Sequence, residues 1–298
     1  MDEKIIEKVM AGLCGMKSDK RINKTVEDLR RKYGVKKNRT WQEIQADHVD
    51  RYNKSKGDLD QEDGYHCEAC NDKGFYQKIV NDQVYTCHCK CEDVRRSIRN
   101  MKRSGLEKVI KDYTFDKYEV TTEWQRELKK VAMEYVRNNV DNWFFIGGNP
   151  GSGKTHLCTA ICRDFLATGH VVHYMLWKEV STKLKSLVND TEKYAMEIKA
   201  LKKVEILYID DFFKPTKDRE GNILPPTSAD VALAFEILDY RKNEGLKTII
   251  SSERYITEII NIDEALGSRI IEMSGKYYNN IKRGTEKNYR MRNINNFL

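Results

Sequence analysis

Short apolar runs alternate with stretches of helical spacing from about residue 112 to the end of the chain. The apolar runs are residues 143–146, 171–176, 204–209 and 248–251, and the helical stretches are residues 123–138, 155–166, 177–189 and 228–242. Such short runs fit buried strands, and strands that alternate with helices form a parallel sheet flanked by helices. The pattern therefore predicts a doubly wound α/β domain over residues 112–298.

The pattern before residue 112 is more polar and has two parts. Residues 1–55 read as helical, and Thr40 with Glu43 matches the pattern that caps the start of a helix. Residues 56–111 form a cysteine-rich module, in which a strand is expected at residues 83–86. The other expected elements are a linker at residues 53–64 and a strongly basic helix at residues 92–110.

Length and composition limit the class of protein. A chain of 298 residues exceeds the usual size of one domain, and 40% hydrophobic with 33% charged residues is typical of a soluble globular protein. No apolar run approaches the roughly 20 residues of a membrane helix. The N-terminus begins with acidic charge and has no long apolar stretch, so it is unlike a signal peptide. We expect a cytoplasmic protein that does not act at a membrane.

Residues 148–155, Gly-Asn-Pro-Gly-Ser-Gly-Lys-Thr, match the phosphate-binding pattern G-x-x-x-x-G-K-[ST], between an expected strand and an expected helix. Gly151 and Gly153 allow the backbone to curl so that its N–H groups point at a phosphate, and the helix adds its positive end. Lys154 would contact the β- and γ-phosphates of ATP, and Thr155 would bind Mg²⁺. The residues expected to bind nucleotide are Gly148, Asn149, Pro150, Gly151, Ser152, Gly153, Lys154, Thr155 and His156.

Two carboxylates follow an apolar run where the second half of such a site is expected. The run Glu-Ile-Leu-Tyr-Ile leads directly into Asp210 and Asp211. We expect Asp210 to hold Mg²⁺ and Asp211 to orient and polarise the attacking water. The next run ends in Ser251 and Ser252, where a residue that senses the γ-phosphate or the water is expected. Ser252 is the first choice and Ser251 the second, and a simple cap of the strand end is the alternative for both.

Three stretches are densely basic, although the formal net charge is only +7. They are residues 17–39, 95–111 and 276–292. A basic run is often only a solvated face, but three of them in a chain with a nucleotide motif favour a polyanionic partner.

Clustered cysteines in a cytosolic protein indicate a metal site rather than disulfides. Cys67 and Cys70 form one close pair, and a second group of possible ligands lies about 20 residues later. That group is Cys87, His88, Cys89 and Cys91. Two close pairs can chelate one tetrahedral ion, and thiolates favour Zn²⁺. Free structural cysteines are the alternative, and the spacing alone leaves the second pair open.

Four segments resemble, in their order and separation, the AAA+ domain of DnaC/DnaI-type replicative helicase loaders, to which the IstB transposition helpers are closely related. They are IGGNPGSGKTHLCTAI, LYIDDFF, TIISSER and IDEALGSRIIEM. The resemblance covers residues 60–295 and implies an AAA+ ATPase that uses ATP and Mg²⁺ and assembles into a homo-oligomer. Residues 214–227 depart from the pattern, because this polar loop is longer than expected, and it could touch DNA or a partner.

The resemblance also assigns roles to single residues. It implies that Arg269 reaches the site of a neighbouring subunit and stabilises charge on the γ-phosphate. An ordinary surface arginine is the alternative, and Met273 stands where some members carry a further arginine. Arg290 would sense nucleotide within its own chain. The aromatic residues expected beside the adenine, or in the core, are Tyr113, Phe115 and Tyr118.

The choice of zinc ligands follows from the same resemblance. Similar members have a Cys-x-Cys just before a basic helix with the pattern Arg-x-Ser-x-Arg, which corresponds here to residues 95–99. This register gives the ligand set Cys67, Cys70, Cys89 and Cys91. It leaves Cys87 or His88 as the spare. The ion would be structural, because the module has few apolar residues for a core of its own.

Three functions are weighed. The first is a loader that binds a DnaB-type replicative helicase through its N-terminal part, holds single-stranded DNA on a basic surface and releases the helicase upon ATP hydrolysis. The second is an IstB-like ATPase that assembles on DNA and delivers it to a transposase; the cysteine module favours the loader. The third is a scaffold that binds nucleotide without hydrolysis, which the intact set Lys154, Thr155, Asp210 and Asp211 disfavours.

Overall fold

The structure, a computed structural model, describes residue 28 and residues 40–102, 112–284 and 287–289. Arg290 and almost all of the basic stretch 17–39 lie outside these residues, as do the ends of the other two basic stretches. The described residues belong to two compact units: the chain up to Lys56 with Phe75–Cys87, and Gly57–Gly74 with the chain from His88 onward. The division into parts at residues 55 and 111 stays a prediction.

From residue 40 onward, the described part of the first unit contains helix α3 (Trp41–Lys54) and a two-stranded sheet. Helix α3 begins with the predicted capping box, in which Thr40 and Glu43 each accept the other's backbone N–H. Strands β1 (Phe75–Val80) and β2 (Gln83–His88) are joined by Asn81 and Asp82, both at positive φ, as in a two-residue hairpin turn. The side-chain amide of Asn53 bonds both backbone groups of Gln77, which ties α3 to β1.

A five-stranded sheet in the order β4-β5-β8-β3-β9 forms the centre of the second unit, and the four pairings between these strands are parallel. The strands are β3 (Phe144–Gly148), β4 (Val172–Leu176), β5 (Ile206–Asp210), β8 (Lys247–Ser252) and β9 (Tyr278–Ile281). Every residue of β3, β5 and β8 is buried, which explains their continuous apolar character. The predicted doubly wound α/β fold is confirmed.

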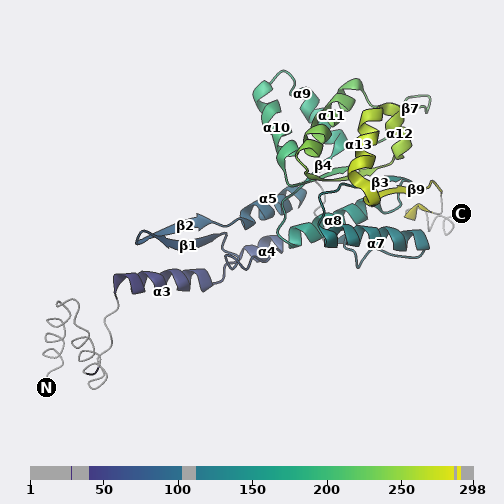
Figure 1. The fold of residues 1–298 in the computed structure, drawn as a ribbon. Coiled ribbons are helices and arrows are strands. Elements are labelled where there is room, and N and C mark those ends of the chain that lie inside the picture. Colours follow the sequence, from purple (N-terminus) through teal and green to yellow (C-terminus); the bar gives the residue numbers. More distant parts are fainter. Residues whose placement is uncertain (1–27, 29–39, 103–111, 285–286, 290–298) are drawn as a thin grey trace. The chain divides into compact units, whose positions relative to one another are not determined.

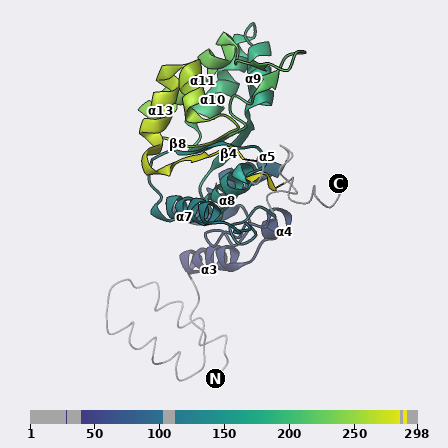
Figure 2. The same cartoon turned by 90° about the vertical axis from the view of Figure 1, so that its right-hand side faces the viewer.

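Helices cover both faces of this sheet (Figure 1). On one face lie α7 (Glu123–Asn138) and α8 (Lys154–Ala167). The other face carries α9 (Trp177–Ser186), α10 (Thr191–Lys203), α11 (Ser228–Asn243), α12 (Ile256–Ile262) and α13 (Glu264–Ser274). Figure 2 shows the same two layers from the side. Successive side chains of β3 point to opposite faces of the sheet and so contribute to two hydrophobic cores. Phe144 and Ile146 pack on the α7–α8 face, and Trp143 and Phe145 pack on the opposite face.

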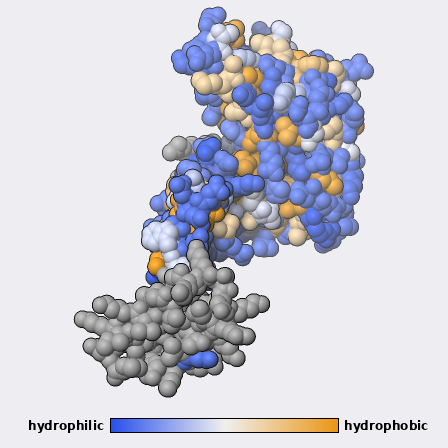
Figure 3. Space-filling view, turned by 60° about the vertical axis from the view of Figure 1, so that its left-hand side comes forward, coloured by the Kyte–Doolittle hydropathy of each residue, from blue (hydrophilic) through white to orange (hydrophobic). Residues whose placement is uncertain are grey.

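Smaller elements complete the second unit. Helix α4 (Leu59–Asp63) lies in the predicted linker, and α5 (Cys91–Met101) follows the cysteines and packs on β4 and α8. The predicted long loop contains a short hairpin, β6 (Thr216–Lys217) with β7 (Ile223–Leu224), and a 3-10 turn η2 (Gly275–Tyr277) precedes β9. None of the described helices is long and apolar enough to cross a bilayer. On the face drawn in Figure 3, hydrophilic side chains dominate the described surface, with hydrophobic ones interspersed.

Candidate nucleotide-binding site and cysteine cluster

The phosphate loop connects the end of β3 at Gly148 with the start of α8 at Lys154. Gly151 and Gly153 have φ of +67° and +88°, a region that side chains rarely adopt. A Cβ at Gly153 would lie 2.9 Å from the ring of Tyr118, and one at Gly151 would collide with the side chain of Asn288. Both positions therefore require glycine, as their predicted role in the loop implies.

The ammonium of Lys154 is held inside this loop. Its Nζ donates to the carbonyl oxygens of Gly148, at 2.9 Å, and of Asn149, at 2.7 Å, and the side chain is buried. Burial lowers the pKa of Lys154 to about 8, although the carboxylates of Glu253 and Asp211 act in the opposite direction. A cation with few charged partners of its own is suited to an anionic ligand such as a phosphate.

Asp210 closes the other side of the site at the end of β5. Its Oδ1 accepts the hydroxyl of Thr155 at 3.3 Å and that of Ser251, and its Oδ2 accepts the hydroxyl of Tyr174 at 3.3 Å. Burial raises the pKa of this carboxyl group. Thr155 and Asp210, the two residues expected to hold Mg²⁺, are thus in contact across the sheet, and their hydroxyl and carboxylate oxygens fit a hard cation.

The two serines at the end of β8 make different hydrogen bonds. Ser251, the second choice, donates to Asp210, whereas the hydroxyl of Ser252, the first choice, donates to the carbonyl of Phe212 at 2.7 Å. Neighbouring residues of a strand point to opposite faces, so only one of the two can face Asp210. These hydrogen bonds favour Ser251 over Ser252 as the residue near the phosphate, and the sensor role stays a prediction for both.

Asp211 stands just beyond β5 with a left-handed backbone, at φ +54°. Its N–H donates to Asp210 Oδ1 at 3.1 Å, and its Oδ2 accepts Lys214 Nζ at 2.6 Å. Lys214 is also 3.7 Å from Glu253 Oε1. Burial lowers the pKa of Lys214, but the hydrogen bond to Asp211 and the negative charges of Asp211, Glu253 and Asp210 together raise it above its ordinary value. Sequence reasoning singled out neither Lys214 nor Glu253.

These groups line one cavity of about 390 Å³ at the phosphate loop. It includes Gly151, Ser152, Gly153, Lys154, Thr155, His156, Asp211, Lys214, Glu253, Lys287 and Tyr289, with part of the segment 112–125. At one end the ring of His156 stacks on Tyr113, with 4.5 Å between centroids and 3° between planes, and meets Tyr118 edge-on. Phe115 belongs to the core instead. Of the three expected aromatics, two therefore face the cavity.

Arg269 does not line the cavity of its own chain. It lies on α13, where Nη2 donates to Asp239 Oδ1 of α11 at 2.8 Å and the guanidinium lies 4.5 Å from the ring centre of Phe235. Its Nε and Nη1 have no hydrogen-bond partner among the described residues. This position agrees with an arginine that acts outside its own subunit, and equally with one that only joins two helices.

The four cysteines selected by the resemblance meet in one buried cluster. The sulfurs of Cys67 and Cys89 are 3.8 Å apart, those of Cys70 and Cys91 are 3.6 Å apart, and all four lie within 4.8 Å of one another. A tetrahedral zinc site with Zn–S bonds of about 2.3 Å has edges of roughly 3.8 Å. The cluster fits Zn²⁺, and neither Cys87 nor His88 is part of it.

A buried ion-pair network stands directly behind this cluster. Asp72 accepts the N–H of Cys67 at 2.7 Å, contacts His66 Nδ1 at 2.7 Å and accepts Arg95 Nη2 at 2.9 Å. Arg95 also donates to both oxygens of Asp63. Arg95 belongs to a helix that was expected to be basic on its surface, but its side chain is fully buried. It lies among the buried residues of α5, together with Val94 and Ile98. The network ties α4 and α5 to the cysteines.

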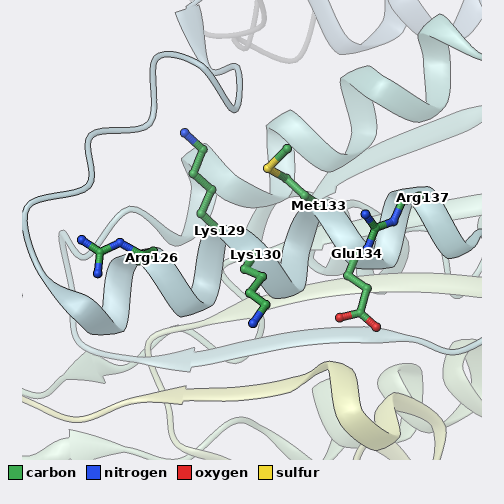
Figure 4. Close-up of a pocket in the computed structure, with 6 residues that line it drawn as sticks. All are labelled: Arg126, Lys129, Lys130, Met133, Glu134 and Arg137. Atoms are coloured by element: carbon green, nitrogen blue, oxygen red, sulfur yellow. The ribbon is translucent and has the colours of Figure 1, made fainter.

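A second hollow lies along the outside of α7 (Figure 4). It is lined by Arg126, Lys129, Lys130, Met133, Glu134 and Arg137. Four of these six side chains are cationic, and no residue of the phosphate loop contributes to it. The apolar face of α7 marks this helix in the sequence, whereas its basic face lies outside the three densely basic stretches.

Comparison with known proteins adds to this geometry. The family described as IstB-like ATP binding protein matches residues 67–271. The phage-like element PBSX protein XkdC of Bacillus subtilis (strain 168) is 30% identical over 244 residues, which are 77% of this chain and 88% of that protein. The replicative helicase loader DnaC of Escherichia coli (strain K12) is 27% identical over 178 residues, 58% of this chain and 67% of that protein. A crystal structure of the DnaC helicase loader aligns with 20% identity and a TM-score of 0.49, over 59% of this chain and 99% of that one.

Proposed function

The chain belongs to the family of IstB-like ATP binding proteins, and from this we propose that it is an ATP-dependent loader of a DnaB-type replicative helicase onto single-stranded DNA. The observation that carries the ATPase part is the contact between Thr155 and Asp210 beside the buried Lys154. The loader part is supported by the relatives named replicative helicase loader and by the cysteine cluster ahead of the ATPase fold.

Each residue of the site has a distinct task in this proposal. The backbone of the loop and Lys154 bind the β- and γ-phosphates, while Thr155 and Asp210 hold Mg²⁺. The bound ion supplies positive charge between these phosphates. Asp211 accepts a hydrogen bond from the attacking water and orients it. Ser251 keeps the carboxylate of Asp210 in place through the hydrogen bond that it donates.

Zinc has a structural task in the proposal. Cys67, Cys70, Cys89 and Cys91 hold Zn²⁺ and so fix the start of α5, whose other side packs on the ATPase core. The buried guanidinium of Arg95 lies close to the sulfur of Cys91 and reduces the cost of forming a thiolate there. Basic side chains on α7 offer contacts for phosphates of the single strand.

Co-purification tests the loader directly. The full chain is mixed with a DnaB-type helicase or with a transposase, in ATP and in ADP, and the retained partner is measured. We expect the helicase to be retained in a nucleotide-dependent way, and Lys154→Ala to abolish that dependence together with ATP turnover. Retention of the transposase alone would favour the IstB-like alternative, and turnover that survives Lys154→Ala would contradict the ATPase site.

A further inference from the structure

Among the residues that the structure describes, four lysines line the nucleotide cavity, and one of them, Lys214, lies in the loop that follows β5. Lys214 lines the same cavity as Lys154 and Thr155. Its Nζ is 2.6 Å from Asp211 Oδ2 and 3.7 Å from Glu253 Oε1. It is therefore a cation at the carboxylate that we assign to the attacking water, where the terminal phosphate of a bound nucleotide would lie.

The backbone that carries Lys214 is fixed by a buried arginine. Arg254 Nε donates to the carbonyl of Phe213 at 2.7 Å, and Nη2 donates to the carbonyl of Leu224 at 3.0 Å. These two bonds hold both ends of the segment that contains the β6–β7 hairpin. The rings of Phe212 and Phe213 are buried and meet Trp177 edge-on, so the chain just before Lys214 is packed. The long polar loop at residues 214–227 thus places Lys214 at a defined position.

The charges around the cavity explain why a cation beside Asp211 is useful there. Asp210, Asp211 and Glu253 gather at the ends of β5 and β8, and Lys154 is the cation that faces them from the loop. A triphosphate brings further negative charge to these carboxylates, and the repulsion is strong at short range in a partly buried site. A flexible ammonium beside Asp211 can turn from that carboxylate to a phosphate oxygen at little cost.

We propose that Lys214 is a cation for the γ-phosphate that the subunit supplies to its own site. When ATP binds, Lys214 moves from Asp211 to a γ-phosphate oxygen, which offsets the charge there and frees Asp211 to orient water. This inference rests on the proposed ATPase function. In this proposal the long polar loop contributes a residue to the nucleotide site, in addition to any contact with a partner.

Nucleotide affinity separates this role from a structural one, because ADP lacks the γ-phosphate. Binding of ADP and of a non-hydrolysable ATP analogue is measured with Mg²⁺ for the full chain and for Lys214→Met, Lys214→Arg and Lys217→Met. We expect Lys214→Met to weaken the ATP analogue by about 10-fold and ADP by less than about 2-fold, the loss of one charge-assisted contact. Lys214→Arg keeps the preference for ATP, and Lys217→Met, in the hairpin that follows Lys214 but outside the cavity lining, changes neither affinity.

Two results would overturn the inference. Equal weakening of both nucleotides by Lys214→Met would mean that the lysine only supports the fold, and unchanged affinities would mean that it does not reach the phosphate. In either case wild-type binding of ADP and of the analogue would leave the proposed function standing. A wild-type chain that binds neither nucleotide would contradict both proposals.

Discussion

Arg241 is a charged residue of α11, yet its side chain is fully buried. Its guanidinium donates to the carbonyls of Leu201, at 3.0 Å, and Val204, at 2.8 Å, and to the hydroxyl of Thr248 at 2.9 Å. It thereby joins the end of α10 to the first residues of β8, the strand that delivers Ser251 to the site. The position is structural, but it fixes the geometry on which the chemistry depends.

Replacing Arg241 with Met should lower the free energy of unfolding by about 3 kcal/mol, because several carbonyls in and near the core lose a charged hydrogen-bond donor. Urea or thermal unfolding of the purified chain measures the change. Arg126→Met is the matched control, since this arginine of α7 is exposed and pairs with Glu123 at the surface. A similar loss in both variants would show that Arg241 contributes no more than a surface arginine.

Which residues could be predicted depended on how local their signal is. Lys154, Thr155 and Asp210 follow from a contiguous motif and from the end of an apolar run, and the structure brings them together. The preference for Ser252 over Ser251 had no local basis, because the register that turns one of them toward Asp210 is set by pairing with other strands. Lys214 was missed because its loop matches no motif and because Glu253, one of its two carboxylate partners, is far along the chain.

At the scale of elements, the central strands were predictable because they are buried on both faces. Strand β9 and helix α10 were not. The sequence of β9, Tyr-Asn-Asn-Ile, lies at the edge of the sheet with a single fully buried side chain. Helix α10 buries only Ile198 and Leu201, so it has little amphipathic signal. Tertiary packing determines that these two segments form a strand and a helix, and a local sequence pattern does not show this packing.

The cysteine cluster belongs to this scale, because it fixes the start of α5. We expect about one equivalent of zinc in freshly purified protein, and chelation should unfold residues 57–74 and 88–101 while nucleotide binding is largely kept. Hydrogen exchange of these residues with and without a chelator is the measurement. The ligand set is tested by a matched pair, in which Cys89→Ser should lose the zinc and Cys87→Ser should retain it. Full zinc content in both variants would mean that Cys89 is not a ligand.

At the scale of the whole molecule, the role proposed for Arg269 depends on assembly, because this residue does not line the cavity of its own chain. We expect Arg269→Ala to lower ATP turnover at least about 10-fold, as for an arginine supplied by a neighbour, with nucleotide affinity unchanged. Turnover is measured with helicase and single-stranded DNA present, and affinity separately.

Asp239→Asn is the control for Arg269, since it removes the ion pair between α11 and α13 and leaves the arginine in place. A residue that acts on a neighbour's phosphate predicts nearly normal turnover in this variant. If Asp239→Asn loses as much turnover as Arg269→Ala, the arginine serves only to join the two helices.

The central claim is that one nucleotide with its metal ion is shared by Lys154 on the loop and by Thr155 and Asp210 across the sheet. The most direct measurement is a structure of the chain with a non-hydrolysable ATP analogue and Mg²⁺. We predict the ion beside the Thr155 hydroxyl and the Asp210 carboxylate, and Lys154 on the β- and γ-phosphates. An analogue bound elsewhere, or a metal ion remote from Asp210, would contradict the account.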